Sequence, residues 1–377
     1  MADSTTSNSN HRRLIIACGG TGGHLFPGIA VAEEWLRRGG EPMLIISEKQ
    51  IDTLATEGYE HLRFERQQSI AMPKLCSPKM FGFGIGFLKA LGHSRKLIKQ
   101  FKAEAVLGMG GFTSAAPLAA GKWSRMPTFI HESNAIPGRA NLLNAKFSTR
   151  VLVGFEACAG HFPGDNISVV GTPLRPSLEN PPEKETALAH FGLRPDRKTL
   201  LVMGGSQGAR RLNELTGLAL ASLPADKVQV LHITGPQDFA AAREAHEAAP
   251  AELATAILPF CSEMQIALAA ADLAVCRSGA STLTELSAFG LPSVLVPYPF
   301  AAHDHQTKNA DLFVSAGAAE LWPQGELKET DFAARLSRLL DDDQRLAVMA
   351  TAMKSLAVPD ASERICDLVE QAMDGSR

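Results

Sequence analysis

The sequence predicts an α/β protein made of two consecutive doubly wound units, each a parallel sheet with helices on both faces. Short apolar runs alternate with helical patterns in both halves of the 377-residue chain, as expected for such sheets. Each half opens with an apolar run that ends in a glycine-rich turn, at residues 19–24 (GGTGGH) and 204–210 (GGSQGAR). A proline-rich and charged stretch within residues 171–198 separates the halves, so we expect two domains.

The first half contains apolar runs that we expect to be strands, at residues 14–18, 42–47, 105–108, 128–131 and 150–154. The first run, LIIAC, is apolar throughout, as in strands that are buried on both faces. A helix is predicted from Gly28 to Arg38, because Gly39 and Gly40 stop the helical pattern there.

The second half repeats this order. Its expected strands lie at residues 199–203, 228–233, 256–258, 273–276 and 293–296, with a helix from about Arg211 after the second glycine turn. The last ~25 residues have the apolar spacing of an amphipathic helix. Residues 1–11 are polar, and we expect them to form a disordered tail.

Composition excludes several classes of protein. The formal net charge of −3 gives no global basic field, which argues against nucleic acid as a partner. The six cysteines are scattered without a CxxC pair, which indicates reduced thiols in a cytosolic protein rather than a zinc ribbon. No apolar run reaches the ~18–20 residues of a spanning helix, and the polar N-terminus lacks the apolar core of a secretory signal.

The first glycine turn predicts an anion site. Free backbone N–H groups and the helix dipole favour a negative charge at such a turn. A nicotinamide dinucleotide loop is the alternative, but the acidic residue expected ~20 positions on is misplaced, since Glu48 lies 29 positions after Gly19. His24 falls in the first helical turn, where the positive dipole end disfavours imidazolium. It is therefore either a neutral proton acceptor or a helix-start residue bonded to a loop carbonyl.

Polar residues follow two further strands. Residues 278–285 (SGASTLTE) open a helix whose N–H groups suit a diphosphate, with Glu285 one turn in and able to bond ribose hydroxyls. Thr282 and Glu285 also have the spacing of a capping box, and both interpretations can hold. Asn134 follows the strand at 128–131, at the sheet edge where ligands bind. His303 and His305 are two residues apart and do not share a helix face, so we expect no metal site there.

The segment of residues 67–103 has the strongest charge bias of the chain. It contains seven basic residues and no acidic one, and it encloses the apolar stretch 80–88 (MFGFGIGFL). Apolar side chains flanked by lysines are typical of a membrane-surface patch. The alternative is a core helix with a solvated basic face. RNA binding is disfavoured because no stacking platform accompanies the charge.

Taken together, these motifs resemble the MurG family of bacterial glycosyltransferases. GGTGGH with FPGIAVAEEW, GMGGFTSAAP, HESNAIPGRAN, GTPLR, GGSQGAR, CRSGASTLTEL and HDHQTKNA occur in that family's order between Gly19 and Ala310. The resemblance implies a GT-B fold with Rossmann-like domains at residues 12–174 and 175–354 and an interdomain cleft. It also implies a C-terminal helix, residues ~355–377, that completes the first domain.

The implied reaction transfers GlcNAc from UDP-GlcNAc to the C4 hydroxyl of MurNAc in lipid I, a polyprenyl diphosphate, giving lipid II. It proceeds with inversion and without a required metal or other cofactor. The resemblance also implies a peripheral location on the cytoplasmic face of the inner membrane, with cell-wall synthesis and division proteins as partners. A non-catalytic nucleotide-binding scaffold is the rival from another class. It would lose acceptor-side residues, whereas His24 and Asn134 are present.

Matching motifs give the implied site residues. The donor-binding set is Thr21, Gly22, Gly23, Asn134, Arg175, Ser206, Phe260, Cys261, Ala280, Ser281, Thr282, Leu283, Thr284, Glu285 and Gln306. Within it, Asn134 and Gln306 bind the sugar, Ser206 the phosphate, and Glu285 the ribose. Phe260 caps the uracil, backbone groups of Cys261 read its edge, and Arg175 contacts the donor at the hinge.

The candidate general base is His24, with Glu132 as the runner-up. The residues expected at the membrane are Phe81, Phe83, Ile85, Phe87 and Leu88, with Lys79 and Lys89 nearby. Two positions depart from the family pattern. Phe112 stands where tyrosine is common, so no hydroxyl can act there, and Ser133 stands where glutamine is common.

Overall fold

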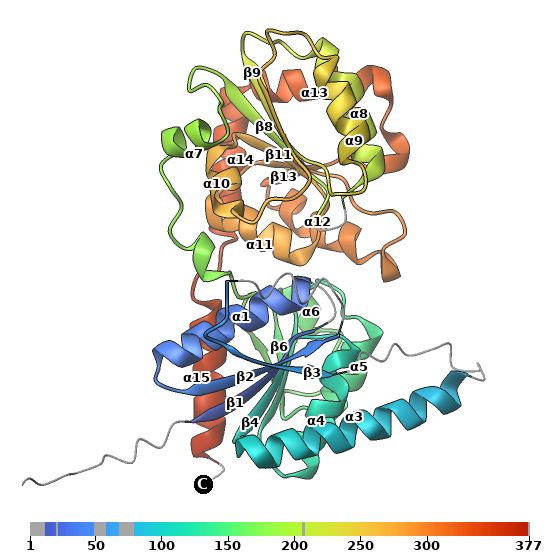
Figure 1. Ribbon diagram of the computed structural model, residues 1–377, viewed down its shortest axis with the longest axis vertical. Coiled ribbons are helices and arrows are strands. Elements are labelled where there is room, and N and C mark those ends of the chain that lie inside the picture. The colour runs from blue at the N-terminus through green and yellow to red at the C-terminus, as the bar shows by residue number, and fades with distance from the viewer. Residues whose placement is uncertain (1–11, 20–21, 49–57, 68–78, 206–207, 376–377) are drawn as a thin grey trace, which may run out of the picture. The chain divides into compact units, whose positions relative to one another are not determined.

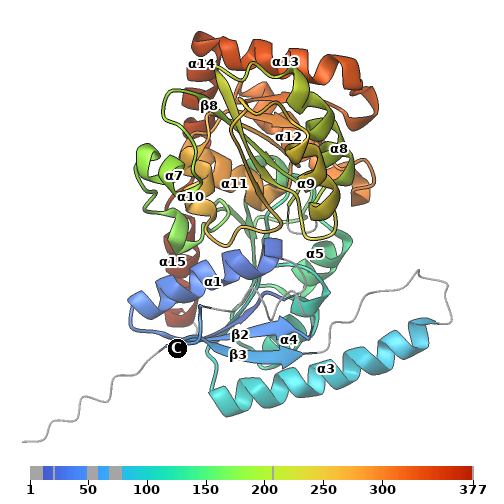
Figure 2. The same ribbon diagram turned by 45° about the horizontal axis from the view of Figure 1, so that its top comes forward.

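The computed structural model describes residues 12–19, 22–48, 58–67, 79–205 and 208–375. The expected disordered tail, residues 1–11, lies outside these ranges. The chain forms two compact units, and in each of them helices cover both faces of a parallel sheet (Figures 1 and 2). Unit 1 comprises Met1–Glu132, Pro137–Pro173 and Asp360–Arg377, and unit 2 comprises Ser133–Ile136 and Leu174–Pro359. The predicted fold class, two parallel α/β units, is confirmed.

Unit 1 contains a 7-stranded parallel sheet with the order β3-β2-β1-β4-β5-β6-β7. Its strands are β1 (Arg13–Ala17), β2 (Glu41–Ser47), β3 (Arg63–Gln67), β4 (Ala105–Gly108), β5 (Thr128–Glu132), β6 (Arg150–Val153) and β7 (Ile167–Val169). The predicted strands are confirmed to within one or two residues. β3 and β7 were not predicted. They are the two edge strands of the sheet, and their side chains are less buried than those of the central strands.

Helices cover both faces of this sheet. Those of unit 1 are α1 (Gly22–Arg37), α3 (Lys79–Phe101), α4 (Ala115–Trp123), α5 (Arg139–Asn144), α6 (Glu156–Ala159) and α15 (Ala361–Asp374), with the 3₁₀ turns η1 (Phe112–Ser114) and η2 (Ala145–Phe147). Leu14 and Ile16 of β1 pack in the cluster that includes α1 and α15 residues. Ile15 and Ala17 pack in the opposite cluster, with α3 and α4 residues. The alternation explains why β1 is apolar at every position.

Helix α1 begins six residues earlier than predicted, inside the glycine motif. Gly22, Gly23 and Pro27 are weak helix formers, so the sequence favoured a loop there. Leu25 is fully buried in the core of unit 1, and this packing stabilises the first turns of the helix. The C-terminal helix α15 packs along α1, where Arg38 donates hydrogen bonds to Asp367 (2.6 Å) and Glu370 (3.0 Å).

Unit 2 contains a 6-stranded parallel sheet with the order β10-β9-β8-β11-β12-β13. Its strands are β8 (Lys198–Met203), β9 (Val228–Ile233), β10 (Thr255–Leu258), β11 (Leu273–Cys276), β12 (Ser293–Leu295) and β13 (Ala319–Leu321). The predicted strands are again confirmed, and the unpredicted strand, β13, is a three-residue edge strand.

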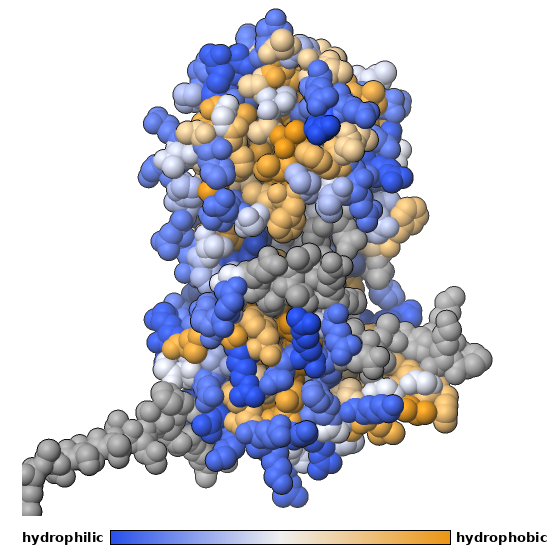
Figure 3. Space-filling model, in the orientation of Figure 1, coloured by the Kyte–Doolittle hydropathy of each residue, from blue (hydrophilic) through white to orange (hydrophobic). Residues whose placement is uncertain are grey.

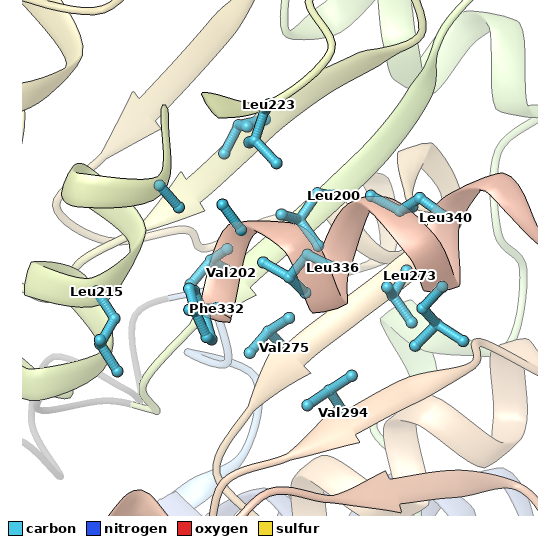
Figure 4. Packing of buried hydrophobic residues seen from close by; sticks show 14 of the residues in the cluster. Leu200, Val202, Leu215, Leu223, Leu273, Val275, Val294, Phe332, Leu336 and Leu340 are labelled. Atoms are coloured by element: carbon cyan, nitrogen blue, oxygen red, sulfur yellow. The ribbon is translucent and has the colours of Figure 1, made fainter. Parts of the chain in front are cut away.

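The helices of unit 2 are α7 (Lys184–His190), α8 (Arg210–Ala219), α9 (Phe239–Glu247), α10 (Met264–Ala270), α11 (Ala280–Phe289), α12 (His305–Ser315), α13 (Glu329–Asp341) and α14 (Asp343–Ser355), with the 3₁₀ turns η3 (Pro176–Leu178), η4 (Leu220–Ser222), η5 (Ala302–Asp304) and η6 (Gln324–Glu326). Figure 4 shows the core on one face of the sheet, where Phe332 and Leu336 of α13 lie over Val202 and Val275.

Two buried histidines in unit 2 share one hydrogen-bond chain. His232 Nε2 lies 3.0 Å from Asn213 Oδ1, and its Nδ1 lies 3.0 Å from His246 Nε2. The amide of Asn213 donates to the Thr234 carbonyl and to Asp238, which fixes its oxygen as the acceptor facing His232. His232 therefore carries its proton on Nε2, and His246 donates from Nε2. Burial, reinforced by His246, lowers the pKa of His232 to about 3, and burial lowers the pKa of His246 to about 4.

We expect acid to destabilise unit 2 through this pair. Both histidines stay neutral when folded and take up protons when unfolded, so their stabilising contribution is complete above pH ~6.5. As the pH falls from ~6.5 towards 4, the free energy of unfolding should fall by up to about 1.4 kcal/mol per pH unit for each histidine. Urea denaturation at several pH values measures this. If a stable His232→Gln/His246→Leu variant lost as much free energy of unfolding as the wild type between pH ~6.5 and 4, the assignment would be contradicted.

Candidate active site

The first glycine turn lies between β1 and α1 in unit 1. A side chain at Gly19 would place its Cβ 2.2 Å from the backbone nitrogen of Ser47, so the turn passes directly against the end of β2. A Cβ at Gly28 would lie 2.5 Å from the Cβ of Cys18, so α1 also lies close to the end of β1. These approaches require glycine. They fix Gly22, Gly23 and His24 at the N-terminus of α1, whereas Thr21 lies outside the described residues.

The GMGG motif packs on His24. A Cβ at Gly110 (φ +117°) would lie 2.8 Å from His24 Nε2, and one at Gly111 (φ +72°) would lie 3.3 Å from Cε1. Glycine is needed at both positions, for the backbone conformation and for the close approach to the ring. The half-buried imidazole is therefore held between the start of α1 and the loop that contains Gly110 and Gly111. Two motifs that are 86 residues apart in sequence meet at this side chain.

Glu132, the second candidate base, is engaged in a buried network. It ends β5, and its Oε2 accepts hydrogen bonds from the backbone of Gly138 (3.0 Å) and from Asn141 Nδ2 (2.9 Å). Asn144 lies next to Asn141 and donates to the carbonyl of Gly111 (2.9 Å). The carboxylate thus organises the start of α5, which in turn holds the loop against His24. This arrangement favours His24 as the base.

Arg175 and Glu285, which are 110 residues apart, come together in unit 2. Arg175 Nη2 donates to Glu285 Oε1 at 2.7 Å, and both side chains are largely buried. Glu285 lies in α11, which begins at Ala280, so Ser281, Thr282, Leu283 and Thr284 form the first turns of that helix. The capping-box interpretation is wrong. Gly279 is the N-cap and has no side chain, so Thr282 lies inside the helix and Glu285 bonds Arg175 instead.

The second glycine turn also requires close backbone packing. A Cβ at Gly204 would lie 2.3 Å from the nitrogen of Ala209, and one at Gly208 (φ +79°) would lie 2.3 Å from the carbonyl oxygen of Thr234. Ser206 lies outside the described residues. Phe260 follows β10 and exposes most of its ring, and Cys261 is half-buried beside it. Burial raises the pKa of the Cys261 thiol, so this residue is no candidate nucleophile.

The two residues expected at the sugar are both anchored in unit 2. Asn134 is half-buried, and its Oδ1 accepts a hydrogen bond from Asn309 Nδ2 at 3.1 Å. Gln306 lies in the first turn of α12, and its Oε1 accepts from the backbone nitrogen of Tyr298 at 2.8 Å. Asn309 is fully buried and was not singled out from the sequence. Its position in the HDHQTKNA motif was the one feature of the sequence that could have pointed to Asn309.

The HDH segment serves as a helix start. His303 and Asp304 have left-handed backbone conformations, with φ of 55° and 54°. The carboxylate of Asp304 accepts a hydrogen bond from the Thr307 hydroxyl at 2.6 Å. In the described parts of the chain, no three His, Cys, Asp or Glu side chains are placed to hold a metal ion.

The residues expected at the membrane divide into two groups on α3. Phe81, Ile85 and Leu88 are 79%, 45% and 65% exposed, and their i, i+4, i+7 spacing puts them in one stripe, followed by exposed Lys89. Phe83 and Phe87 are half-buried and stack with ring centroids 6.4 Å apart. The side chain of Lys79 lies outside what the structure describes.

The two ends of helix α3 differ in burial. Its C-terminal half is a core helix, since Leu91, Leu97, Ile98 and Phe101 are buried in unit 1. Its N-terminal end extends past the sheet, and hydrophobic side chains gather there on the surface (Figures 1 and 3). Phe112, at the position where tyrosine was expected, packs edge-on against Phe83 with centroids 6.2 Å apart. Within the described ranges no helix is both long and apolar enough to span a bilayer.

Comparisons with known proteins agree with this architecture. Residues 14–153 match the glycosyltransferase family 28 N-terminal domain, and residues 199–365 match the corresponding C-terminal domain. Among solved structures, the MurG of Acinetobacter baumannii is 27% identical with a TM-score of 0.75, and the match covers 96% of this chain and 99% of that one. The calicheamicin glycosyltransferase CalG4 is 16% identical with a TM-score of 0.67, over 97% and 99% of the two chains, and shares the fold.

Curated relatives match over nearly the whole chain. The relative from Halothermothrix orenii is 34% identical over 97% of this chain and 100% of its own length. Those from Geobacter sulfurreducens and Xanthomonas campestris are 37% and 39% identical, over 94% and 96% of this chain and 97% and 82% of their own lengths. All three are named UDP-N-acetylglucosamine–N-acetylmuramyl-(pentapeptide) pyrophosphoryl-undecaprenol N-acetylglucosamine transferase. The chain therefore belongs to this MurG family of glycosyltransferases, and its fold is GT-B.

Proposed function

We propose that this protein transfers GlcNAc from UDP-GlcNAc to the C4 hydroxyl of MurNAc in lipid I and so makes lipid II. The observation that carries the proposal is the full-length similarity to transferases of that name, at 34–39% identity in the three relatives described above. The motifs that support it are distributed over both units, with the proposed base in unit 1 and most of the proposed donor-binding residues in unit 2. A non-catalytic scaffold would be expected to lose acceptor-side residues, whereas His24 and Asn134 are present.

The donor's nucleotide end is assigned to unit 2. In this proposal the first turn of α11, which begins at Ala280, presents backbone N–H groups to the diphosphate, and Glu285 accepts bonds from the ribose hydroxyls. Arg175 holds that carboxylate at 2.7 Å. The exposed ring of Phe260 provides an apolar cap for uracil, and the backbone of Cys261 reads the edge of the base. Asn134 and Gln306 bind the hydroxyls of the sugar.

The chemical step in this proposal is a displacement at the anomeric carbon. His24 accepts the proton of the C4 hydroxyl as that oxygen forms a bond to C1 of GlcNAc, and the bond from C1 to the UDP oxygen breaks. Attack from the face opposite UDP inverts the configuration. The negative charge that develops on UDP is stabilised by the N–H groups of α11, by Ser206 and by Thr21, Gly22 and Gly23 at the edge of the donor.

We expect activity to withstand EDTA. The charge on the departing UDP is met in this scheme by helix N-termini and hydroxyl groups, so no divalent cation is needed. Rates measured with excess EDTA and with added magnesium should agree closely. Activity that EDTA abolishes and magnesium restores would contradict the metal-free scheme.

The membrane surface is the second proposed partner. Phe81, Ile85 and Leu88 form an apolar stripe on α3, and Lys89 with the basic residues of the helix's second half supplies positive charge. Insertion of this stripe would hold the protein at the cytoplasmic face of the inner membrane, where lipid I is presented. Proteins of cell-wall synthesis and division are further proposed partners at that surface.

Vesicle binding should depend on this stripe. The variant Phe81→Ser/Ile85→Ser/Leu88→Ser is expected to bind anionic phosphatidylglycerol vesicles at least tenfold more weakly, because each buried apolar side chain contributes about 1–3 kcal/mol. High salt should also weaken wild-type binding. Phe83 and Phe87 are left intact because they pack within unit 1. The matched control, Leu218→Ser/Val348→Ser, removes exposed apolar side chains from unit 2 and should bind like wild type. Unchanged sedimentation of the triple variant would contradict this assignment.

Label transfer tests the proposed function. Purified protein is incubated with radiolabelled UDP-GlcNAc and a lipid I analogue, and the lipid product is separated by chromatography. The proposal predicts label in the lipid only when the acceptor is present. Absence of label in the lipid, with folded protein and an intact acceptor, would overturn it.

A further inference from the structure

A small hollow lies between α3 and α4 in unit 1, two helices that pack side by side (Figure 1). Three aromatic rings, small side chains of the two helices and the end of β3 line it, among them Gln67, Phe83, Phe87, Ala90, Phe112 and Ala116. Phe83 packs against both other rings, with its centroid 6.4 Å from that of Phe87 and 6.2 Å from that of Phe112. All three rings keep exposed area, so the hollow is not sealed inside the core.

The size and the chemistry of the hollow fit one methyl group. Its volume of about 10 Å³ leaves room for a single group of the size of a water molecule. Within the part of the chain that the structure describes, Gln67 is the only polar residue of the lining, and its Oε1 accepts a hydrogen bond from the Ser94 hydroxyl at 3.0 Å. Because a buried water needs about two to four polar partners, this lining favours an apolar group. Phe112, at the position where tyrosine is common, adds no hydroxyl.

The hollow lies between the proposed base and the proposed membrane surface. One wall is Phe112, which directly follows Gly111, and a Cβ at Gly111 would lie 3.3 Å from Cε1 of His24. The other wall is a face of α3 that includes Phe83 and Phe87. At 3.6 residues per turn, these two side chains lie on the opposite side of α3 from its exposed apolar stripe.

The acceptor of the proposed reaction has to pass this place. Its sugar must reach His24 while the far end of its prenyl chain stays in the bilayer. The part of the chain nearest the diphosphate must then pass α3, and a helix is about 10–12 Å across with its side chains. Every isoprene unit of a prenyl chain carries one methyl branch, which is a group of the size that the hollow accepts.

We infer that the hollow between α3 and α4 is a subsite for the isoprenoid chain of the acceptor, and that a methyl branch near the diphosphate is buried there among Phe83, Phe87 and Phe112. The inference rests on the proposed function, which supplies the prenyl diphosphate. The subsite recognises a branched chain, whereas the apolar stripe on the other side of α3 contacts the bilayer as a whole. The linear acyl chains of membrane lipids carry no such branch.

Two acceptors that differ only in branching test this. A lipid I analogue with a 3,7-dimethyloctyl chain and one with an n-decyl chain have the same number of carbons and the same diphosphate and sugar. Rates are measured with saturating UDP-GlcNAc, without vesicles and below the micellar concentration of either acceptor. The wild-type KM should be about fourfold lower for the branched acceptor, the effect expected for one buried methyl group. Equal KM values would overturn the inference.

Filling the hollow should remove this preference. Ala116 is buried in α4 and lines the hollow, so Ala116→Val adds two methyl groups there and should bring the two KM values within about twofold of each other. Ala90→Val fills the hollow from α3 and covers the case in which Ala116→Val does not fold. Ala157→Val is the matched control. Ala157 is exposed on α6, outside the lining, and its variant should keep the wild-type preference.

The outcomes separate the inference from the proposed function. A preference for the branched acceptor that persists in every filling variant that folds would overturn the inference alone. Wild-type protein that transfers GlcNAc to neither acceptor would overturn the proposed function, and the inference with it.

Discussion

Replacing His24 with alanine is expected to lower kcat about 10²–10⁴-fold while the affinity for UDP stays nearly unchanged. The imidazole is half-buried at the start of α1 and is enclosed by Gly110 and Gly111, so its position is fixed by backbone on both sides. Deleting it removes the proposed proton acceptor for the C4 hydroxyl without disturbing the proposed uridine site, which belongs to unit 2. Steady-state rates with saturating donor and acceptor, together with UDP titration, measure the effect.

His61→Ala is the matched control for this prediction. His61 is an exposed histidine of unit 1 that bonds Glu33 at 2.7 Å, and its loss should leave kcat within about twofold of wild type. A kcat loss below about tenfold in folded His24→Ala protein would remove His24 from the role of base. The candidates for the base would then be Glu132 or a water molecule that relays the proton, although Glu132 accepts hydrogen bonds from Gly138 and Asn141.

Glu285→Ala is expected to raise the KM for UDP-GlcNAc about 10–100-fold. Two effects act in the same direction. The ribose hydroxyls lose their acceptor, and Arg175 loses the carboxylate that it contacts at 2.7 Å in a largely buried site. Glu285→Gln keeps an acceptor oxygen but not the charge, so it should lie between alanine and wild type.

Glu329→Ala controls for the loss of an ion pair in general. Glu329 pairs with Arg211 on the surface of unit 2, where such a pair contributes about 0–1 kcal/mol, so KM should not change. A KM for Glu285→Ala within about threefold of wild type would contradict the assignment of this carboxylate to the donor.

The central strands of both sheets could be predicted from the sequence alone. Strands such as β1 and β8 are buried on both faces, so almost every position must be apolar, and this pattern is visible without the structure. The edge strands β3, β7 and β13 were not predicted. β3 reads RFERQ and β13 reads AEL, because an edge strand is covered less and tolerates charged side chains.

The parts of the site that lie in one short motif could be predicted from the sequence. The two glycine turns are visible as runs of glycine, and glycine is required there because the backbone at Gly19 and Gly204 lies too close to its neighbours for a side chain. Partnerships between distant segments were not predictable. Asn309 bonds Asn134 across 175 positions, and Arg175 bonds Glu285 across 110, and no local pattern encodes either pair.

The spacing of the apolar residues also did not show which face of α3 packs against the rest of unit 1. The aromatic residues of that helix looked equivalent in the sequence, yet Phe81 is exposed whereas Phe83 packs on Phe87 and Phe112. This face is covered by α4 and by Phe112 of η1, which follow later in the chain. Only tertiary packing distinguishes the two groups.

The most direct test of the account follows the anomeric proton of GlcNAc by NMR during the reaction of UDP-GlcNAc with a lipid I analogue. The GT-B fold does not identify the reaction by itself, because one fold can host several chemistries. The account predicts that the α-linked donor signal decays only when acceptor is present and is replaced by a β-linked GlcNAc on C4 of MurNAc. Decay without acceptor, a 2-epimer, or an α-linked product would contradict it.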